Sequence, residues 1–119
     1  RAEAIPNLEI IDPVGYVEMV KLMNRARLIL TDSGGVSKES SFAGAKCLFM
    51  LNLDIWEDLL REHWICRVNP EQEDSVEEAL AFAEHARRVA VEDRPRYYGD
   101  GCAAQQMLQA LQKTGLVGN

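Results

Sequence analysis

The sequence contains no hydrophobic run approaching the roughly 20 residues that a membrane-spanning helix needs. It also begins without a basic stretch followed by an apolar one, so we expect no signal peptide and no membrane partner. Its three cysteines, Cys47, Cys66 and Cys102, stand far apart without paired spacing, which argues against a disulfide framework and a zinc site. We therefore expect a reducing, cytoplasmic compartment, with Cys47 and Cys66 buried as small apolar residues.

Positive charge is scarce as well. The chain carries 13 basic and 19 acidic residues, a net charge of −6. A protein this acidic is a poor binder of nucleic-acid backbones, so we expect no nucleic-acid partner. An anionic ligand would have to be held by local hydrogen-bond donors. No residue pattern indicates a cofactor or a metal ion, and we expect neither.

The composition is that of an ordinary globular domain, with 119 residues of which 47% are hydrophobic and 27% charged. Short apolar runs that end at turn residues predict strands over residues 8–11, 27–31, 47–51 and 64–68. Apolar residues at helical spacing predict helices over residues 16–24, 36–43, 55–62, 75–89 and 102–113. Gly44 is expected to close the second helix, and Ser75 with Glu78 forms a capping box that is expected to begin the fourth.

This alternation of strands and helices predicts an α/β fold, a Rossmann-like parallel sheet with flanking helices. Doubly wound domains commonly have five or six strands, whereas four are predicted here. We therefore expect part of a Rossmann-like domain, with an uncovered sheet edge and apolar face. Such surfaces favour a homo-oligomer, a dimer or larger assembly in which elements could be swapped.

The strongest chemical signal is the turn from Thr31 to Gly35, which follows a predicted buried strand and opens a helix. Ligands of open α/β sheets bind at the carboxyl ends of the strands, and a helix N-terminus there offers free N–H groups and a positive dipole end. Gly34 and Gly35 would let a phosphate or diphosphate approach the backbone, and Ser33 could cap the helix and donate its hydroxyl. Glu39, one turn on, could accept two hydrogen bonds from a ribose diol.

A plainer interpretation of this turn stays open. A strand-to-helix connection can need glycine for its backbone geometry and serine for capping, and an isolated Ser-Gly-Gly is weaker evidence than a complete P-loop. Other residues also have plain interpretations. The charged residues Glu77, Glu78, Glu84, Arg87 and Arg88 are expected on a solvated helix face, and Trp56 and Trp64 as packing residues rather than a platform for a base. Arg94 and Arg96 either touch an absent domain or are exposed.

Residues 28–36, LILTDSGGV, resemble the signature segment of the non-hydrolysing UDP-N-acetylglucosamine 2-epimerase family. Further features fit in order: Asp12-Pro13 and Tyr16 before the segment, then Lys38-Glu39, Phe42 and Gly44 after it. Tyr98-Gly99-Asp100-Gly101 matches the closing motif of the family and leads into the last helix. The resemblance covers nearly the whole chain, and Lys38-Glu39, Phe42 followed by Cys47, and the two tryptophans are similar to a subgroup that acts on UDP-diacetamido-sugar uronates or related UDP-sugars.

The resemblance implies a GT-B-like fold, in which two Rossmann-like domains hold a UDP-sugar between them and the C-terminal domain binds UDP. Residues 1–119 would be part of that C-terminal domain, and the N-terminal domain with its catalytic carboxylates would be a missing partner. Ser33, Gly34 and Gly35 would hold the diphosphate and Glu39 the ribose. Met19 stands where the family often places an aromatic against the uracil; its alternative role is a core helix residue. His63 and His85 match no histidine of the family and are expected at the surface.

The family reaction eliminates UDP to give a glycal and adds UDP back from the other face, so the parent would be an isomerase of cell-surface polysaccharide biosynthesis. We expect this chain to be its nucleotide-binding portion, with no catalytic residue of its own and no activity alone. One departure supports an alternative: Leu51 stands where the family carries an arginine. The chain could then be a non-catalytic UDP-sugar-binding or regulatory module, or part of a UDP-sugar hydrolase or glycosyltransferase of the same architecture.

Overall fold

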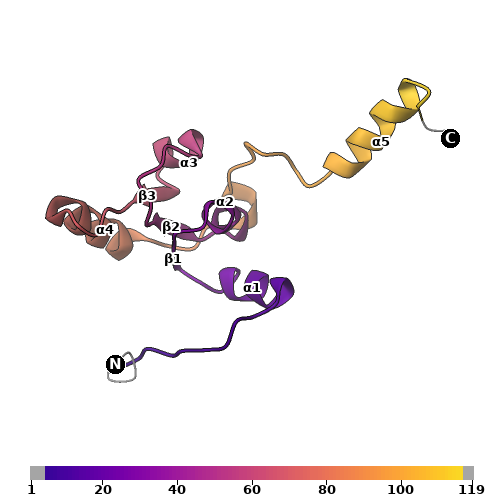
Figure 1. The fold of residues 1–119 in the computed structure, drawn as a ribbon. Helices are drawn as coiled ribbons and strands as arrows, with labels where there is room; N and C mark the ends of the chain where they lie inside the picture. Colours follow the sequence, from indigo (N-terminus) through magenta and orange to yellow (C-terminus); the bar gives the residue numbers. More distant parts are fainter. Residues whose placement is uncertain (1–4, 117–119) are drawn as a thin grey trace.

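The computed structural model describes residues 5–116 of the chain. Its centre is a parallel sheet of three strands in the order β1-β2-β3 (Figure 1). The strands are β1 (Leu28–Thr31), β2 (Lys46–Phe49) and β3 (Ile65–Arg67). The helices are α1 (Tyr16–Met23), α2 (Gly34–Ala43), α3 (Glu57–Arg61), α4 (Glu73–His85) and α5 (Ala103–Lys113), with a short 3-10 turn, η2 (Val91–Asp93). The predicted α/β class, a Rossmann-like parallel sheet with flanking helices, is confirmed.

The core lies on both faces of this sheet, because successive residues of a strand point to opposite sides. One cluster contains Cys47 and Phe49 of β2 together with Leu59, Trp64 and Ile65. The other contains Leu48 and Cys66 with Ala79 of α4. The predicted burial of Cys47 and Cys66 is thus confirmed, and burial raises the pKa of both thiols, that of Cys47 to about 12.

The side of α2 that faces the sheet is built from serines rather than apolar residues. Ser37, Ser40 and Ser41 are fully buried. Each hydroxyl donates to the carbonyl three residues earlier in its own helix, at 2.9, 2.7 and 2.7 Å. Each hydroxyl therefore has an acceptor within its own helix, and α2 presents small side chains to the strands.

Gly44 ends α2, as predicted, in a left-handed conformation with φ 74°. A Cβ at this position would lie 2.6 Å from the Val89 carbonyl oxygen and 2.6 Å from Arg94 Nε. Glycine is required here both by the backbone angle and by the close approach of residues 89–94.

The strand predicted over residues 8–11 is wrong, and the sheet has three strands rather than four. Within residues 5–116 no strand lies alongside this segment to pair with it, and Ile10 and Ile11 are exposed. An apolar run becomes a strand only when neighbouring backbone groups accept its hydrogen bonds. The sequence shows the run but not the partner.

The capping box predicted at Ser75 is also wrong. α4 begins two residues earlier, at Glu73, and its N-cap Gln72 makes no side-chain hydrogen bond. The Ser75 hydroxyl instead accepts a hydrogen bond from the Asn69 backbone N–H at 2.8 Å. It therefore ties the turn before α4 to the helix rather than capping it.

α4 ends at His85 and not near Val89, which leaves Arg87 and Arg88 outside the helix. The expected solvated face holds for Glu77, Glu78 and Glu84, which are exposed. Arg87 and Arg88 are also exposed, but their expected place on the helix is wrong. The Arg88 guanidinium in addition donates hydrogen bonds to the carbonyls of Met23, Ala26 and Ala43. Arg88 is thus exposed to solvent, and its hydrogen bonds also connect the end of α1 to the end of α2.

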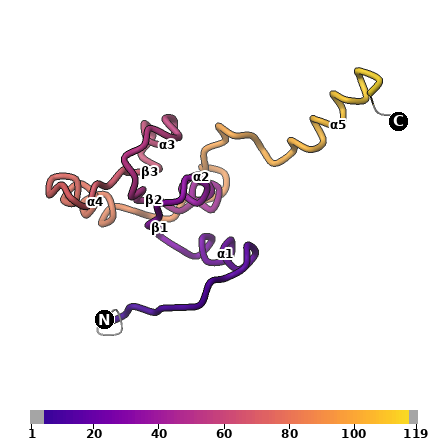
Figure 2. The backbone as a smooth tube through the Cα atoms, viewed as in Figure 1, coloured from indigo at the N-terminus to yellow at the C-terminus, as the bar shows by residue number. Residues whose placement is uncertain are grey.

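The two terminal helices differ in how they meet the rest of the fold. α1 packs beside α2 and has Met23 as its buried residue. α5 lies well apart from the sheet at the end of an extended segment, as the backbone tube shows (Figure 2). It exposes Met107, Leu108 and Leu111. No helix found among residues 5–116 has both the length and the apolar character needed to cross a bilayer.

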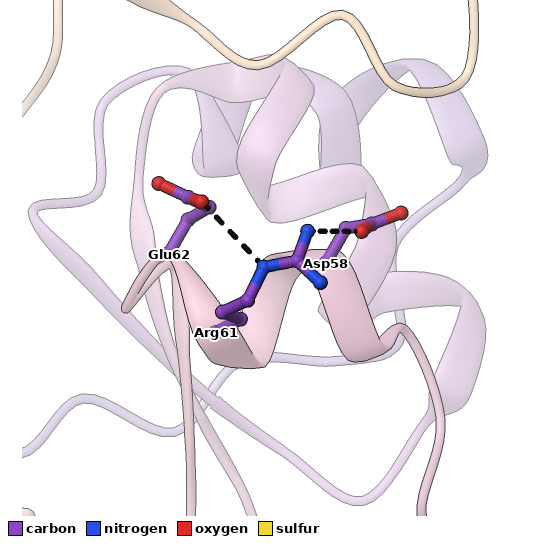
Figure 3. Close-up of polar contacts among 3 residues, drawn as sticks. All are labelled: Asp58, Arg61 and Glu62. Carbon is purple, nitrogen blue, oxygen red and sulfur yellow. Dashed lines mark hydrogen bonds and ion pairs between the residues drawn. The ribbon is translucent and has the colours of Figure 1, made fainter.

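α3 carries ion pairs at the protein surface (Figure 3). Arg61 Nη2 lies 2.5 Å from Asp58 Oδ1, and Arg61 Nε lies 3.7 Å from Glu62 Oε1. The Asp58 carboxylate raises the pKa of the Arg61 guanidinium. Because all three side chains are largely exposed, water and salt screen these pairs, and they contribute little to stability.

Candidate functional site

The candidate site is the turn between β1 and α2, at the carboxyl end of a strand, where open α/β sheets bind ligands. Ser33 is the N-cap of α2, as predicted, and its side chain accepts a hydrogen bond from the Val36 N–H at 3.4 Å. The Ser33 N–H donates in turn to Thr31 Oγ1 at 3.0 Å. The turn is thus fixed by its own side chains, and Ser33 remains exposed.

The first backbone donors of α2 are free. Among the hydrogen bonds of the part of the chain that the structure describes, none uses the N–H of Gly34 or Gly35. Both groups stand at the N-terminus of a helix of 10 residues, where the macrodipole favours negative charge. The turn therefore offers two unengaged donors to an anion.

The glycines of the turn are not needed for backbone geometry. Neither Gly34 nor Gly35 belongs to the residues with positive φ. A Cβ at Gly35 would meet only Ser33 Oγ, at 3.8 Å, and one at Gly34 would meet Ile55 Cδ1 at 3.3 Å. The interpretation that this turn uses glycine for its conformation is therefore not supported. What glycine provides at residue 35 is open space beside the N–H groups.

The two other predicted site residues, Glu39 and Met19, lie on neighbouring helices. Gly35 and Glu39 are four residues apart on α2 and so share one face of the helix. Met19 lies on α1, which packs against α2. Its side chain is 36% exposed whereas Met23 is 4% exposed, so Met23 and not Met19 is the core methionine of α1. The structure thus places Ser33, Gly34 and Gly35 at the start of α2, Glu39 one turn further along it, and Met19 on the adjacent helix.

Trp56 is the residue of this site that sequence reasoning missed. It packs against the core cluster, as expected of a packing residue, and Trp64 is part of that cluster. The indole Nε1–H of Trp56, however, also donates a hydrogen bond to the Gly34 carbonyl oxygen at 2.9 Å. The only sequence signal for such a contact is the residue type, since a partly buried tryptophan usually finds a partner for its N–H.

Lys38 and Tyr98 complete a cluster around Trp56. The Lys38 Nζ lies 4.5 Å from the Trp56 ring centroid and 4.0 Å from that of Tyr98. The Trp56 and Tyr98 rings meet edge to face, with centroids 5.6 Å apart. Tyr98 belongs to the closing motif, so this motif reaches α2 next to the turn. Partial burial raises the pKa of the Tyr98 hydroxyl.

The two arginines before the closing motif have different surroundings. Arg94 is half-buried and donates to the carbonyls of Phe42 at 2.7 Å and Val89 at 3.2 Å, whereas Arg96 is exposed. After the motif, the Cys102 N–H donates to the Asp100 carboxylate, and this bond lowers the Asp100 pKa. A cavity of about 480 Å³ lies here, lined by Phe42, Val91, Arg94–Arg96 and Tyr98–Gly101.

The other candidate positions are two histidines and Leu51, which directly follows the residue whose N–H donates to the Thr31 carbonyl at the start of the turn, Met50, at 2.9 Å. His63 and His85 are exposed, as expected. Leu51 is exposed, and Arg67 forms an ion pair with Asp54 in the loop that follows it. A cavity of about 700 Å³ lies between β3 and α4, and the residues of the turn are not among those that line it.

Comparisons with known proteins place the chain beside one enzyme family. The family model described as UDP-N-acetylglucosamine 2-epimerase matches residues 1–112. The chain is 34% identical over 106 residues to the UDP-2,3-diacetamido-2,3-dideoxy-D-glucuronate 2-epimerase of Pseudomonas aeruginosa, covering 89% of this chain and 29% of that protein. It is 32% identical over 108 residues to the UDP-N-acetylglucosamine 2-epimerase of Escherichia coli K12, covering 90% of this chain and 29% of that protein.

Proposed function

Because the chain belongs to the UDP-N-acetylglucosamine 2-epimerase family, we propose that it is the nucleotide-binding portion of a UDP-sugar 2-epimerase-like protein. It spans about 29% of the length of the curated relatives that it matches. The observation that carries the proposal is the turn at Ser33–Gly35, with two unengaged N–H groups and open space at the start of α2. Residues 1–119 would form part of a UDP-binding domain, with a second domain as partner.

The proposed binding mode assigns one part of UDP to each element. The diphosphate oxygens would accept hydrogen bonds from the N–H groups of Gly34 and Gly35 and from the Ser33 hydroxyl. Bonds to an anionic acceptor are stronger than neutral ones, and the helix dipole adds to them. The Glu39 carboxylate would accept from the ribose hydroxyls, and the Met19 thioether would pack on the uracil. These local donors would act against the net charge of −6.

In the proposed reaction, the sugar loses its C2 proton and the bond between C1 and UDP breaks, which leaves a glycal and free UDP. UDP then adds back to C1 as a proton returns to the opposite face of C2. The turn would hold UDP through both steps and stabilise the negative charge that develops on the departing diphosphate. The proton transfers need general acids and bases supplied by the second domain. The chain alone would therefore bind UDP and catalyse nothing.

A second candidate function is a non-catalytic UDP-sugar-binding or regulatory module. The observation that favours it is Leu51, an exposed apolar side chain where the family pattern calls for an arginine. The guanidinium of Arg67 is already paired with Asp54 and is not a free replacement. UDP binding without UDP release from a UDP-sugar, measured on the chain joined to its second domain, would favour the module. Turnover would favour the epimerase.

Calorimetric titration of the chain with UDP tests the site directly. We expect binding by the wild type, a loss of about tenfold or more in affinity for Glu39→Ala, and a change of less than about twofold for Glu77→Ala. Glu77 is the matched control because it is an exposed glutamate on α4, away from the turn. Equal losses in the two variants, or no binding by the wild type, would reject this assignment.

A further inference from the structure

We propose that Trp56 is a positioning residue of the nucleotide site, which fixes and polarises the peptide between Gly34 and Gly35 through its indole N–H. The proposal rests on the function proposed above. It assigns a role to a loop residue outside the signature segment and to the Tyr98 of the closing motif, neither of which has a part in the binding mode so far.

The Gly34 carbonyl oxygen accepts two side-chain hydrogen bonds. Trp56 Nε1 donates to it at 2.9 Å, and Ser37 Oγ donates at 2.9 Å. This carbonyl and the Gly35 N–H belong to the same planar peptide unit. Donors on the oxygen draw electron density toward it and make the N–H a stronger donor, by roughly 10–30% per bond in condensed-phase estimates. The Gly35 N–H is one of the two groups that the binding mode aims at the diphosphate.

The indole is held in place from three separate segments. Trp56 itself has a left-handed backbone, φ 55° and ψ 52°, which a non-glycine residue adopts only when its surroundings impose it. Tyr98 meets the ring edge to face, and the ammonium of Lys38 lies over both aromatic rings. α2, the loop before α3 and the closing motif thus converge on one indole whose N–H reaches the turn.

Trp64 is a second tryptophan that packs in the core, and it serves as a comparison for Trp56. It is buried in the same core cluster and has the Lys46 ammonium 4.4 Å from its ring centroid. Between residues 5 and 116, the structure has no hydrogen bond from the Trp64 indole to the turn. The two tryptophans of the sequence therefore share a residue type, a core and a cationic neighbour, and differ in the contact with Gly34.

The test compares Trp56→Phe with Trp64→Phe in the 119-residue chain, with calorimetric titrations of UDP and of inorganic pyrophosphate. Trp56→Phe keeps an aromatic ring and removes the N–H. We expect it to weaken both ligands by the same factor, about threefold to tenfold, because the effect acts on the diphosphate turn. Trp64→Phe should stay within about twofold. Equal behaviour of the two variants, or a loss confined to UDP, would overturn the proposal.

Two further readouts separate positioning from folding. The amide proton of Gly35 should shift upfield in Trp56→Phe and stay in place in Trp64→Phe, as a measure of peptide polarisation. In Trp64→Phe, Trp56 is the remaining indole, and pyrophosphate should change its fluorescence. If the wild type binds UDP and Gly35 does not shift, this inference alone fails. If the wild type binds neither ligand, the proposed function fails and this inference with it.

Discussion

Arg88 donates a hydrogen bond to the carbonyl oxygen of Ala26, 62 positions earlier in the chain, at 2.8 Å. The same guanidinium donates to the Met23 carbonyl at the end of α1 and to the Ala43 carbonyl at the end of α2. A cation at two helix C-termini is favoured by both dipoles. Because α1 buries little else than Met23, Arg88 is a principal connection between the helix that carries Met19 and the helix that carries the turn.

We therefore predict that Arg88→Ala loosens α1 while leaving α2 in place. Amide hydrogen exchange should become faster in residues 16–23 and change little in residues 36–43. The affinity for UDP should fall more than that for pyrophosphate, because the uracil contact is assigned to α1. Arg87→Ala is the control, since within the described part of the chain Arg87 bonds only to the carbonyls of Glu84 and Ala86 in its own segment. Uniformly faster exchange across the chain would contradict this role for Arg88.

Substitutions at Ser33 should separate capping from ligand binding. Ser33→Ala removes the acceptor for the Val36 N–H, and we expect the free energy of unfolding to fall by about 0.5–1 kcal/mol, the lower part of the range for N-caps because the bond is 3.4 Å long. Ser33→Asp keeps a good cap and should keep that stability, yet it should abolish UDP binding because its carboxylate repels the diphosphate. Thermal denaturation and calorimetry measure the two effects. UDP binding by Ser33→Asp at wild-type affinity would contradict the site.

The three thiols should react at very different rates. Cys102 is exposed, whereas Cys47 and Cys66 are buried and burial raises their pKa values. Since the thiolate is the reactive form, a thiol reagent at pH 8 should modify about one cysteine per native chain and about three in denaturant. Rapid reaction of a second thiol in the native chain would contradict the burial described here.

The Cys47 thiol also predicts a dependence of stability on alkaline pH. Its pKa is raised from 9.0 to about 12 in the folded chain, so folding disfavours the thiolate. Its contribution to stability is fully present below the unfolded pKa and is lost as the pH rises from about 9 toward 12. Denaturant titrations across this range should therefore show a smaller alkaline loss for Cys47→Ala than for the wild type. Parallel pH profiles for the two proteins would contradict the prediction.

Self-association is expected from the open side of β1. Leu30 is 60% exposed on this strand, which is an edge of the sheet and pairs only with β2 among the described residues. Light scattering should show a dimer or larger species whose share grows with concentration, and Leu30→Glu should shift it toward the monomer. Leu80→Glu, at an exposed leucine of α4, is the control. A wild-type monomer at high concentration would contradict this expectation.

The elements that could be predicted are those marked by residues within or next to the element itself. Apolar runs identified β1, β2 and β3, and Ser33 and Gly44 marked the two ends of α2 where the structure has them. The capping box at Ser75 failed although its pattern is local, because the hydroxyl has a competing partner, the Asn69 N–H, that the pattern does not contain.

Contacts between distant positions could not be predicted. The bond between Trp56 and Gly34 joins residues 22 positions apart, and that between Arg88 and Ala26 joins residues 62 apart. The strand expected over residues 8–11 failed for the same physical reason, because pairing depends on a partner elsewhere. The position of the candidate site could therefore be predicted from the sequence. The long-range contacts of Trp56 and Arg88 with the elements that form it could not.

The serine face of α2 has a consequence for how this part of the molecule can change. The hydroxyls of Ser37, Ser40 and Ser41 have acceptors within the helix, so the packing of α2 against the sheet depends mainly on side-chain volume. Alanine would fit between α2 and the sheet, whereas a branched side chain would push the helix away from the strands and tilt its N-terminus. A larger residue at any of these three positions would therefore change the direction in which the first backbone donors of α2 point, even though it would lie outside the turn itself.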